Sequence, residues 1–291
     1  MDNQTSVNNH TDNIPRLPPR ADDSHKGHYG RALLIGGSRG MTGAIALTGM
    51  STLRSGAGLA TLAVPGVCLE CVAGLDPCYT TIPLPCDPQG RVAEEAREQL
   101  IELAGRFTAA ALGPGLGRGD GLDRLVRTLY TTLTLPMVCD ADALNALAQH
   151  PDGLSSPGGP RIMTPHPGEF NRLTGGSASG PKEREELAHE LARSHGIVMV
   201  LKGHRTLVTD GTHHQHNQTG NPGMATGGAG DVLTGVITAL LCQGLGPWDA
   251  ARLAAHVHGL AGDCAARRLS MVAMTARDIA DSLAEAWREF A

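Results

Sequence analysis

Short apolar runs alternate along this chain with longer stretches in which apolar side chains recur every three or four positions. The short runs indicate buried strands, whereas the recurring pattern indicates helices with one apolar face. The runs predict strands over residues 31–37, 58–65, 107–115, 135–142, 161–168 and 196–203. The recurring pattern predicts helices over residues 42–56, 93–105, 121–133, 183–196 and 232–244.

This alternation predicts an α/β fold, with a mainly parallel central sheet and helices on both of its faces. Residues 206–217 carry Asp210-Gly211 between two extended runs, a pattern typical of a β-hairpin. No change in composition divides the rest of the chain, so we expect one domain over residues 26–291. Residues 1–25 are polar, contain prolines and lack an apolar segment. They predict a disordered N-terminal arm instead of a signal peptide.

Composition narrows the classes of partner. The 291 residues carry a formal net charge of −5 and only 3% aromatic side chains, which argues against nucleic-acid binding. No apolar stretch approaches the length of a membrane span, so we expect no membrane partner. The 7 cysteines, in a chain without an export signal, predict reduced thiols and a cytoplasmic location.

Clusters of glycine, proline and aspartate follow the predicted strands. In an open α/β sheet the carboxyl ends of the strands form the edge at which ligands bind. We therefore expect one crevice lined by residues 36–38, 113–117, 140–142, 164–169, 202–206 and 227–231. The glycine-rich segments 36–44 and 113–117 are weak signals alone, because a tight structural turn explains them equally well.

The segment GNPGMATGGAGDVLTGV, residues 220–236, gives the strongest chemical signal. A glycine-rich turn that enters a buried helix presents backbone N–H groups to an anion such as phosphate. Asp231 would repel that phosphate, so its presence favours a base that takes a proton from a neighbouring hydroxyl. Phosphoryl transfer needs both features together. The helix N-terminus stabilises a negative charge, so we expect Asp231 to be ionised at neutral pH.

Other side chains at this edge are candidates with structural alternatives. Asp140 ends a buried strand and needs a cation, water or donors, whereas Asp142 is explained as the N-cap of the next helix. His166 and Glu169 share a proline-bounded loop, and a functional pair is favoured over a structural histidine. Lys202 ends an apolar strand, where its amine would meet phosphate.

Three histidines lie in the predicted hairpin, at positions 213, 214 and 216. Their spacing suggests a metal site, but a solvated hairpin tip is the favoured interpretation.

Six motifs, in one order over residues 26–285, resemble those of the ADP/ATP-dependent NAD(P)H-hydrate dehydratases, which have the ribokinase-like fold. They are GGSRGMTGA (36–44), LGPGLGR (112–118), CDADALNAL (139–147), TPHPGEF (164–170), LKGHRT (201–206) and NQTGNPGMATGGAGD (217–231). The family often carries a fused NAD(P)H-hydrate epimerase domain, and the length of this chain predicts a free-standing dehydratase.

The resemblance implies repair of hydrated NADH and NADPH (NADHX and NADPHX). ADP, or ATP in some members, phosphorylates the C6 hydroxyl of the hydrate, and loss of phosphate restores NAD(P)H. With ADP as the donor the other product is AMP. Phosphorylation before elimination is chemically reasonable, because the lone pair of the ring nitrogen next to C6 expels phosphate far more easily than hydroxide.

The resemblance also implies roles for individual residues. Asp231 is the catalytic base, and the anion hole consists of the amides of Gly228, Ala229 and Gly230. The hydrate is bound by Ala44, Gly117, His166 and Asp231. The nucleotide is bound by Lys202, Gly203, His204, Arg205, Thr206 and Gly230. Mg²⁺ is expected with the nucleotide phosphates, and its candidate ligands are Asp140, Glu169 and solvent.

Family membership further implies a functional partnership with NAD(P)H-hydrate epimerase and a homotetramer. Two other functions compete with the dehydratase. A small-molecule kinase of the same fold, of the hydroxyethylthiazole or hydroxymethylpyrimidine type, would share the Gly-Gly-Ala-Gly-Asp sequence, but His166 within TPHPGE argues against it. A non-catalytic nucleotide sensor gains nothing from the charge of Asp231 beside phosphate.

Overall fold

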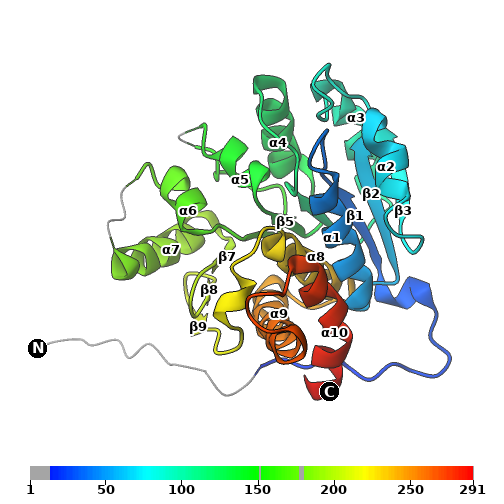
Figure 1. Ribbon diagram of the computed structural model, residues 1–291. Coiled ribbons are helices and arrows are strands. Elements are labelled where there is room, and N and C mark those ends of the chain that lie inside the picture. Colours follow the sequence, from blue (N-terminus) through cyan, green and yellow to red (C-terminus); the bar gives the residue numbers. More distant parts are fainter. Residues whose placement is uncertain (1–13, 151, 177–179, 291) are drawn as a thin grey trace, which may run out of the picture.

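The computed structural model describes residues 14–150, 152–176 and 180–290, which fold around a nine-stranded sheet (Figure 1). The strand order is β3-β2-β1-β4-β5-β6-β7-β8-β9. Strands β1 to β7 are parallel, and β8 and β9 continue the sheet as an antiparallel hairpin, as predicted. The strands are β1 (Arg31–Ile35), β2 (Leu59–Pro65), β3 (Thr80–Leu84), β4 (Ala109–Leu112), β5 (Met137–Cys139), β6 (Arg161–Met163), β7 (Val198–Leu201), β8 (Leu207–Thr209) and β9 (His214–His216).

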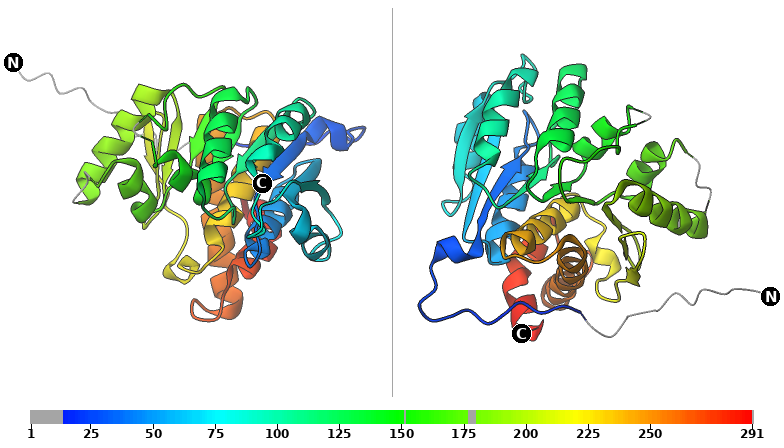
Figure 2. Two further views of the ribbon diagram at one scale, coloured as in Figure 1. Left: turned by 90° about the horizontal axis from the view of Figure 1, so that it is seen from above. Right: turned by 180° about the vertical axis from the view of Figure 1, so that it is seen from behind.

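Helices cover both faces of the sheet, which confirms the predicted α/β class (Figure 2). One face packs against α1 (Thr42–Arg54), α2 (Leu69–Ala73), α8 (Ala229–Cys242), α9 (Pro247–Leu269) and α10 (Ala276–Phe290). The other packs against α3 (Arg97–Ala104), α4 (Asp120–Thr132), α5 (Asp142–Leu147), α6 (Pro167–Leu173) and α7 (Pro181–His195). Short 3-10 helices are η1 (Lys26–Tyr29), η2 (Gly66–Cys68), η3 (Glu94–Ala96) and η4 (Pro222–Met224).

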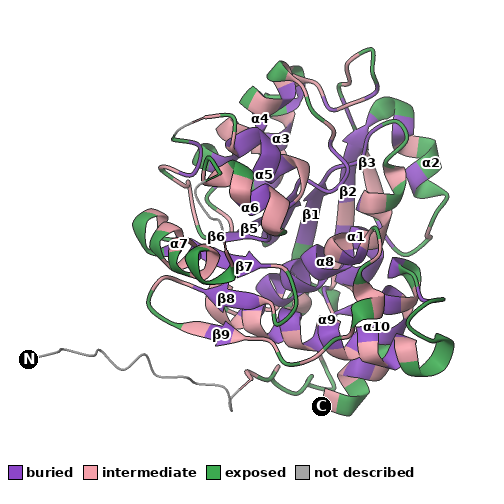
Figure 3. Cartoon of the chain, turned by 60° about the vertical axis from the view of Figure 1, so that its left-hand side comes forward, coloured by how far each residue is buried: buried purple, intermediate pink, exposed green. Residues whose placement is uncertain are grey.

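The parallel strands are apolar on both faces because both faces are buried. Along β1, for example, Leu34 faces the α8 side of the sheet, whereas Leu33 and Ile35 face the α4 side. Figure 3 shows the resulting buried centre, with most exposed residues on the outer surfaces of the helices and in the loops. None of the described helices is long and apolar enough to cross a bilayer.

The strand order reverses between β1 and β4, so the loops that follow these two strands lie side by side. Gly37 N–H donates to the carbonyl of Pro114 at 2.8 Å. The Ser38 hydroxyl donates to the carbonyl of Gly115, also at 2.8 Å. A side chain at Gly36 would lie 2.3 Å from the Pro114 oxygen, so the close approach requires glycine. Ligands of open α/β sheets bind at such a reversal.

Residues 1–13 of the predicted N-terminal arm lie outside the described residues, whereas residues 14–25 contact the folded body. The Arg16 guanidinium donates to the carbonyl of Phe290 at 2.6 Å. Arg20 donates to the carbonyl of Gly56 at 2.8 Å, and its guanidinium lies 3.7 Å from the centre of the Tyr29 ring. This part of the arm is ordered because its arginines find backbone and aromatic partners on the folded body.

Candidate active site

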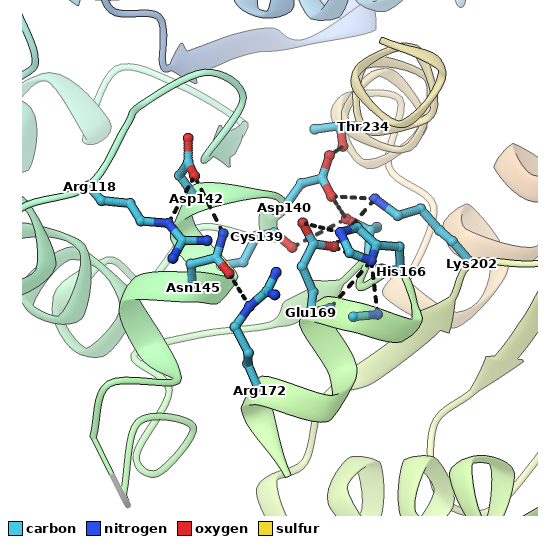
Figure 4. A network of polar contacts seen from close by, with 12 residues as sticks. Arg118, Cys139, Asp140, Asp142, Asn145, His166, Glu169, Arg172, Lys202 and Thr234 are labelled. Carbon is cyan, nitrogen blue, oxygen red and sulfur yellow. Dashed lines mark hydrogen bonds and ion pairs between the residues drawn. The ribbon is translucent and has the colours of Figure 1, made fainter. Parts of the chain in front are cut away.

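Asp140 is the centre of a polar network at the carboxyl edge of the sheet (Figure 4). It follows β5 and is 1% exposed. Its Oδ1 accepts hydrogen bonds from the Thr164 hydroxyl at 2.7 Å and the Lys202 ammonium at 2.8 Å, while Oδ2 accepts from the Thr234 hydroxyl at 2.8 Å. Burial alone would raise the pKa of Asp140, but Lys202 and the hydroxyl donors outweigh burial and lower it. The buried charge predicted from the sequence is therefore matched by donors from three elements.

Lys202 stays charged because of the same contacts. Burial opposes the charge, but Asp140 and Glu169 raise the pKa of the ammonium above its usual value. The distance from Lys202 Nζ to Glu169 Oε2 is 3.9 Å. A side chain at Gly230 would lie 3.0 Å from Nζ, so the ammonium faces the first turn of α8.

The three amides that were predicted to form an anion hole lie at the N-terminus of α8. Gly228 adopts a left-handed conformation, with φ of 92°, immediately before the helix. Within the described residues, no hydrogen bond engages the backbone N–H of Gly228 or Gly230. The Ala229 N–H, by contrast, donates to the carbonyl of Thr226 at 3.4 Å. Two of the three predicted amides are thus available to an anion, and the third already has an acceptor inside the chain.

Asp231 lies in the first turn of α8, half-buried, and its carboxylate has no hydrogen bond or ion pair with any other described residue. Burial and then the charge of Asp140 raise the pKa of Asp231 to about 7, and Lys202 offsets only part of this rise. The prediction that Asp231 is fully ionised at neutral pH is therefore wrong, since burial and neighbouring charge outweigh the helix dipole. A carboxyl group with a pKa near 7 is well suited to general-base work.

His166 and Glu169 form a reciprocal cap at the start of α6. His166 Nδ1 accepts from the backbone N–H of Gly168 at 3.0 Å and of Glu169 at 3.4 Å. Glu169 Oε2 accepts from the backbone N–H of His166 at 2.8 Å. Burial, Lys202 and Arg172 lower the pKa of His166, so the ring is neutral and carries its proton on Nε2. The sequence did not reveal this capping role.

Asp142 was predicted to cap α5, but Ala141 occupies the N-cap position and makes no side-chain cap bond. Asp142 is instead the first residue of the helix, and its Oδ2 accepts from the backbone N–H of Gly117 at 2.8 Å. Asn145 donates to Asp142 at 3.4 Å and accepts from Arg172 at 2.7 Å. Asp142 therefore fixes the loop after β4.

Ala44 and Gly117, the other predicted hydrate contacts, lie where the two loops meet. A side chain at Gly115 would lie 3.1 Å from Ala44 Cβ. Gly117 has φ of 81°, and a side chain there would lie 3.0 Å from Arg91 Cδ. The two residues border the point of strand reversal, and Arg91 was not identified from the sequence.

Residues 202–206 join β7 to β8, as the nucleotide prediction requires of a strand-end loop. Thr206 closes the turn, because its hydroxyl donates to the Gly203 carbonyl at 3.2 Å and accepts from the Gly203 N–H at 3.4 Å. Gly203, His204 and Arg205 are exposed. The turn thus directs Lys202 inward and presents the next three residues to solvent.

The network contains Thr164, which lies in the predicted crevice segment 164–169, and three residues outside the predicted crevice, Thr234, Asn145 and Arg172. Thr164 and Thr234 bind Asp140, and Asn145 and Arg172 link α5 to α6. Thr234 follows Asp231 by three positions on α8, a spacing that places both on neighbouring parts of one helix face. That spacing was the sign in the sequence that Thr234 could belong to the same site as Asp231.

The chain is similar to known proteins in both sequence and fold. The family model described as NAD(P)H-hydrate dehydratase matches residues 32–285. The bifunctional NAD(P)H-hydrate repair enzyme Nnr of Moorella thermoacetica is 46% identical over 271 residues, which cover 92% of this chain and 51% of that protein. The Escherichia coli enzyme of the same name is 39% identical over 271 residues, covering 92% and 49%. The chain spans about half the length of the curated relatives that it matches.

Solved structures show the same relationship. The ADP/ATP-dependent NAD(P)H-hydrate dehydratase of Bacillus subtilis, co-crystallized with ATP/Mg²⁺, superposes with a TM-score of 0.80 at 33% identity, covering 94% of this chain and 95% of that one. A ribokinase-like superfamily protein of Enterococcus faecalis has a TM-score of 0.80 at 26% identity, covering 94% and 92%. The hydroxyethylthiazole kinase of Pyrococcus horikoshii, at 16% identity and a TM-score of 0.59, covering 89% of each chain, shares the fold alone. The resemblance read from the six motifs is confirmed: the chain belongs to the NAD(P)H-hydrate dehydratase family and has the ribokinase-like α/β fold.

Proposed function

We propose that this chain is a hydro-lyase that restores NADH and NADPH from their hydrates, NADHX and NADPHX, with ADP or ATP as the phosphoryl donor. The observation that carries this proposal is the placement of Asp231. Its carboxylate, with a raised pKa and no protein partner among the described residues, stands beside the unpaired amides of Gly228 and Gly230 and close to the Lys202 ammonium. This arrangement joins a base to an anion site, as phosphoryl transfer to a hydroxyl requires.

In the proposed first step, Asp231 takes the proton of the C6 hydroxyl while the hydroxyl oxygen attacks the terminal phosphorus of the donor. The bond from that phosphorus to the bridging oxygen breaks, and AMP leaves from ADP, or ADP from ATP. In the second step the ring-nitrogen lone pair expels phosphate from C6, and a proton is lost from C5. Hydrate and donor are thereby converted to NAD(P)H, phosphate and the shortened nucleotide.

The remaining residues serve binding and charge stabilisation in this proposal. Lys202 and the amides of Gly228 and Gly230 carry the negative charge of the transferring phosphoryl group. The exposed turn of residues 203–206 contacts the nucleotide. Ala44, Gly117 and the neutral His166 ring border the space for the hydrate, and the His166 Nε2–H, which lies 3.4 Å from Glu169 Oε1, would turn to donate to the hydrate.

In this proposal Mg²⁺ is bound mainly by the phosphates of the nucleotide. Both oxygens of Asp140 already accept hydrogen bonds, and the Lys202 ammonium, 2.8 Å away, would repel a second cation, so Asp140 does not fit as a direct ligand. Glu169 retains acceptor capacity on Oε1, and we propose that it meets the ion through water. Mg²⁺ commonly keeps several waters and binds phosphates in this way, where it neutralises phosphate charge.

The decisive experiment incubates the chain with hydrated NADH or NADPH and either donor, with Mg²⁺, and follows the near-ultraviolet absorbance of the dihydronicotinamide. We expect absorbance to return with release of one phosphate for each NAD(P)H formed. A small-molecule kinase would consume ATP on an alcohol without restoring absorbance, and a sensor would bind nucleotide without either change. No return of absorbance with any donor–hydrate pair would refute the proposal.

We also propose a homotetramer that works in the cytoplasm beside an NAD(P)H-hydrate epimerase. The relatives are named bifunctional repair enzymes, which supports a second repair activity acting with this one. Light scattering on the purified chain measures the assembly. Addition of a separate epimerase to a mixture of the two C6 epimers of the hydrate should raise the final yield of NAD(P)H.

A further inference from the structure

Four side chains that the proposed reaction does not use converge between α7 and the β8–β9 hairpin. His214 and His216 lie two positions apart on β9, so they point to the same face of the sheet. Gln215 points to the other face, where Arg252 of α9 donates to it. Glu185 and His189 lie four positions apart on α7, and therefore on one helix face. Figure 3 shows α7 beside β8 and β9.

This placement corrects the expectation of a solvated hairpin tip. Only His213 of the three hairpin histidines is exposed, and its Nδ1 lies 3.0 Å from Asp210 Oδ2. His214 and His216 are half-buried and face α7. The His189 and His214 rings are 5.0 Å apart between centres, and the His216 Nε2 to Glu185 Oε1 distance is 3.1 Å.

The separations match those of a four-coordinate zinc site. With Zn–N distances of about 2.0–2.1 Å and tetrahedral angles, imidazole centres lie about 5.2 Å apart and neighbouring donor atoms about 3.3 Å apart. The observed ring separations are 5.0 Å for His189–His214 and 6.1 Å for His214–His216. No three of these four side chains have donor atoms that all lie within 4.8 Å of one another, so coordination requires rotation of the side chains about their torsions. The His189 and His214 rings already have the separation of such a site, whereas the His214 and His216 rings must move closer together.

The hydrogen-bond pattern leaves ring nitrogens available. The Thr209 hydroxyl donates to the His213 carbonyl at 2.8 Å, so at its 2.7 Å contact with His189 Nδ1 it accepts the ring N–H. His189 Nε2 therefore keeps its lone pair, in the way that an outer partner orients a metal-bound histidine. No hydrogen bond to the His214 ring is found within the described part of the chain.

We propose that Glu185, His189, His214 and His216 bind a zinc ion that joins α7 to the β8–β9 hairpin. Three neutral imidazoles and one carboxylate are ligands that zinc accepts in a closed tetrahedral site. The proposal is independent of the dehydratase reaction, because none of the four side chains belongs to the network around Asp140.

A second group of donors provides a competing location. Cys264, Glu285 and Glu289 have donor atoms within 4.8 Å of one another. The Arg267 guanidinium, however, contacts Cys264 Sγ at 3.0 Å and Glu289 at 2.5 Å. A cationic side chain already occupies this group, so it carries no proposal and serves as a control.

The test measures zinc affinity of the metal-stripped full chain by competition with a chromophoric chelator, in excess Mg²⁺ to occupy hard oxygen sites. We expect one zinc per chain, and at least about a tenfold loss of affinity in each of His214→Ala and His216→Ala. His213→Ala and Cys264→Ser should bind zinc as the wild type does. Cobalt(II) in place of zinc should give the visible absorption of a tetrahedral ion, and His214→Ala should lose it.

Folding of the variants is checked without metal, by circular dichroism and melting temperature, so that a loss of zinc binding is not a loss of structure. Zinc affinity that is equal in the wild type and His214→Ala, or that disappears only in Cys264→Ser, would overturn the proposal. Absence of zinc binding by the wild type would do so as well.

Discussion

Asp140 and Asp231 are neighbouring carboxyl groups whose surroundings move their pKa values in opposite directions. Lys202 and two hydroxyl donors keep Asp140 ionised although it is buried. Asp231 lacks such donors, and the fixed charge of Asp140 is the second largest cause of its raised pKa, after burial. A pair of titratable groups separated in this way indicates a division of roles, here an anchor for Lys202 and a base.

Replacement of Asp231 by asparagine tests the role of the base. Asp231→Asn should lower kcat by about 10²–10⁴-fold, as loss of a general base does. Nucleotide affinity should be retained or increased, because a negative charge near the phosphates is removed. Rate and binding measurements on the same preparation check both expectations, and near-normal turnover would remove Asp231 from the mechanism.

The same variant should change stability with pH. The folded-state pKa of Asp231 is raised from 3.8 to about 7, so the folded chain loses stability as the pH rises through this window and the carboxyl group ionises. At about pH 8.5, Asp231→Asn should therefore stabilise the fold, by up to about 4 kcal/mol. At about pH 4 the gain should nearly vanish, because Asp231 is then neutral. Melting temperatures at both pH values decide the matter.

The pH dependence of the wild-type rate follows from the same group. Because the base must be ionised to accept a proton, kcat/KM should fall as the pH drops below about 7. The falling limb should reach one decade per pH unit if Asp231 alone controls it. A profile that stays level to about pH 5.5 would contradict the raised pKa.

At the scale of elements, two glycines at the start of α8 allow the binding of nucleotide and the stability of the fold to be tested separately. Gly230 has ordinary helical geometry, and an added methyl group would meet the mobile end of Lys202 at 3.0 Å. Gly228 has φ of 92°, and its added methyl group would meet Leu47 at 2.7 Å and Ala276 at 2.9 Å. The first change disturbs a ligand contact, whereas the second strains the backbone and the core.

Gly230→Ala should therefore keep the wild-type melting temperature and weaken nucleotide binding by about tenfold, which is about 1.4 kcal/mol. Gly228→Ala should lower the free energy of unfolding by about 1–3 kcal/mol. Calorimetry for nucleotide and thermal unfolding for stability measure the two variants side by side. Equal nucleotide affinity in Gly230→Ala and the wild type would place the phosphates elsewhere.

Elements were predictable from the sequence where the local pattern decides the structure. The apolar runs predicted six of the parallel strands, because strands buried on both faces are continuously apolar. Asp210-Gly211 between two extended runs predicted the hairpin. Strand β3 was missed, since its residues are partly exposed and include Pro83, as suits an edge strand. The first turns of α5 and α6 were misread or missed, because capping depends on backbone geometry: Ala141 has φ of 50°, and His166 supplies a ring nitrogen where a hydroxyl or carboxylate is usual.

The candidate site was predictable in outline for a different reason. Every parallel strand ends at the same edge of the sheet, so sequence order alone brings Asp140, His166 and Lys202 together, whereas Asp231 joins them from the first turn of α8, after the antiparallel hairpin. Their pKa values were not predictable, because these depend on distances between side chains from separate loops. The pairing of Asp140 with Lys202 is such a distance: it keeps Asp140 charged, and that charge adds to burial, the largest cause, in raising the pKa of Asp231.

At the scale of the whole molecule, the N-terminal arm and the active site lie at opposite ends of α8. The arm contacts Gly56, next to Ser55, whose carbonyl accepts from Gln243 at the end of α8. Asp231 lies in the first turn of the same helix, about 18 Å from Gln243 at a rise of 1.5 Å per residue. Contacts of the arm therefore stabilise the fold without touching substrate.

Deletion of residues 1–25 should lower the free energy of unfolding by about 1–3 kcal/mol, because the Arg16 and Arg20 contacts are lost. The KM for nucleotide and for hydrate should stay unchanged. Deletion of residues 1–13 alone is the matched control and should leave the melting temperature unchanged. A change in either KM on the longer deletion would show that the arm reaches the crevice.

The bonds between the loops after β1 and β4, from Gly37 to Pro114 and from Ser38 to Gly115, have an evolutionary consequence. The surface they offer a substrate is largely main chain, which point mutation cannot reshape without breaking the loops apart. Single substitutions in these loops should therefore change substrate specificity little. Laboratory evolution toward a different hydrate should proceed by loop insertions or deletions before single substitutions.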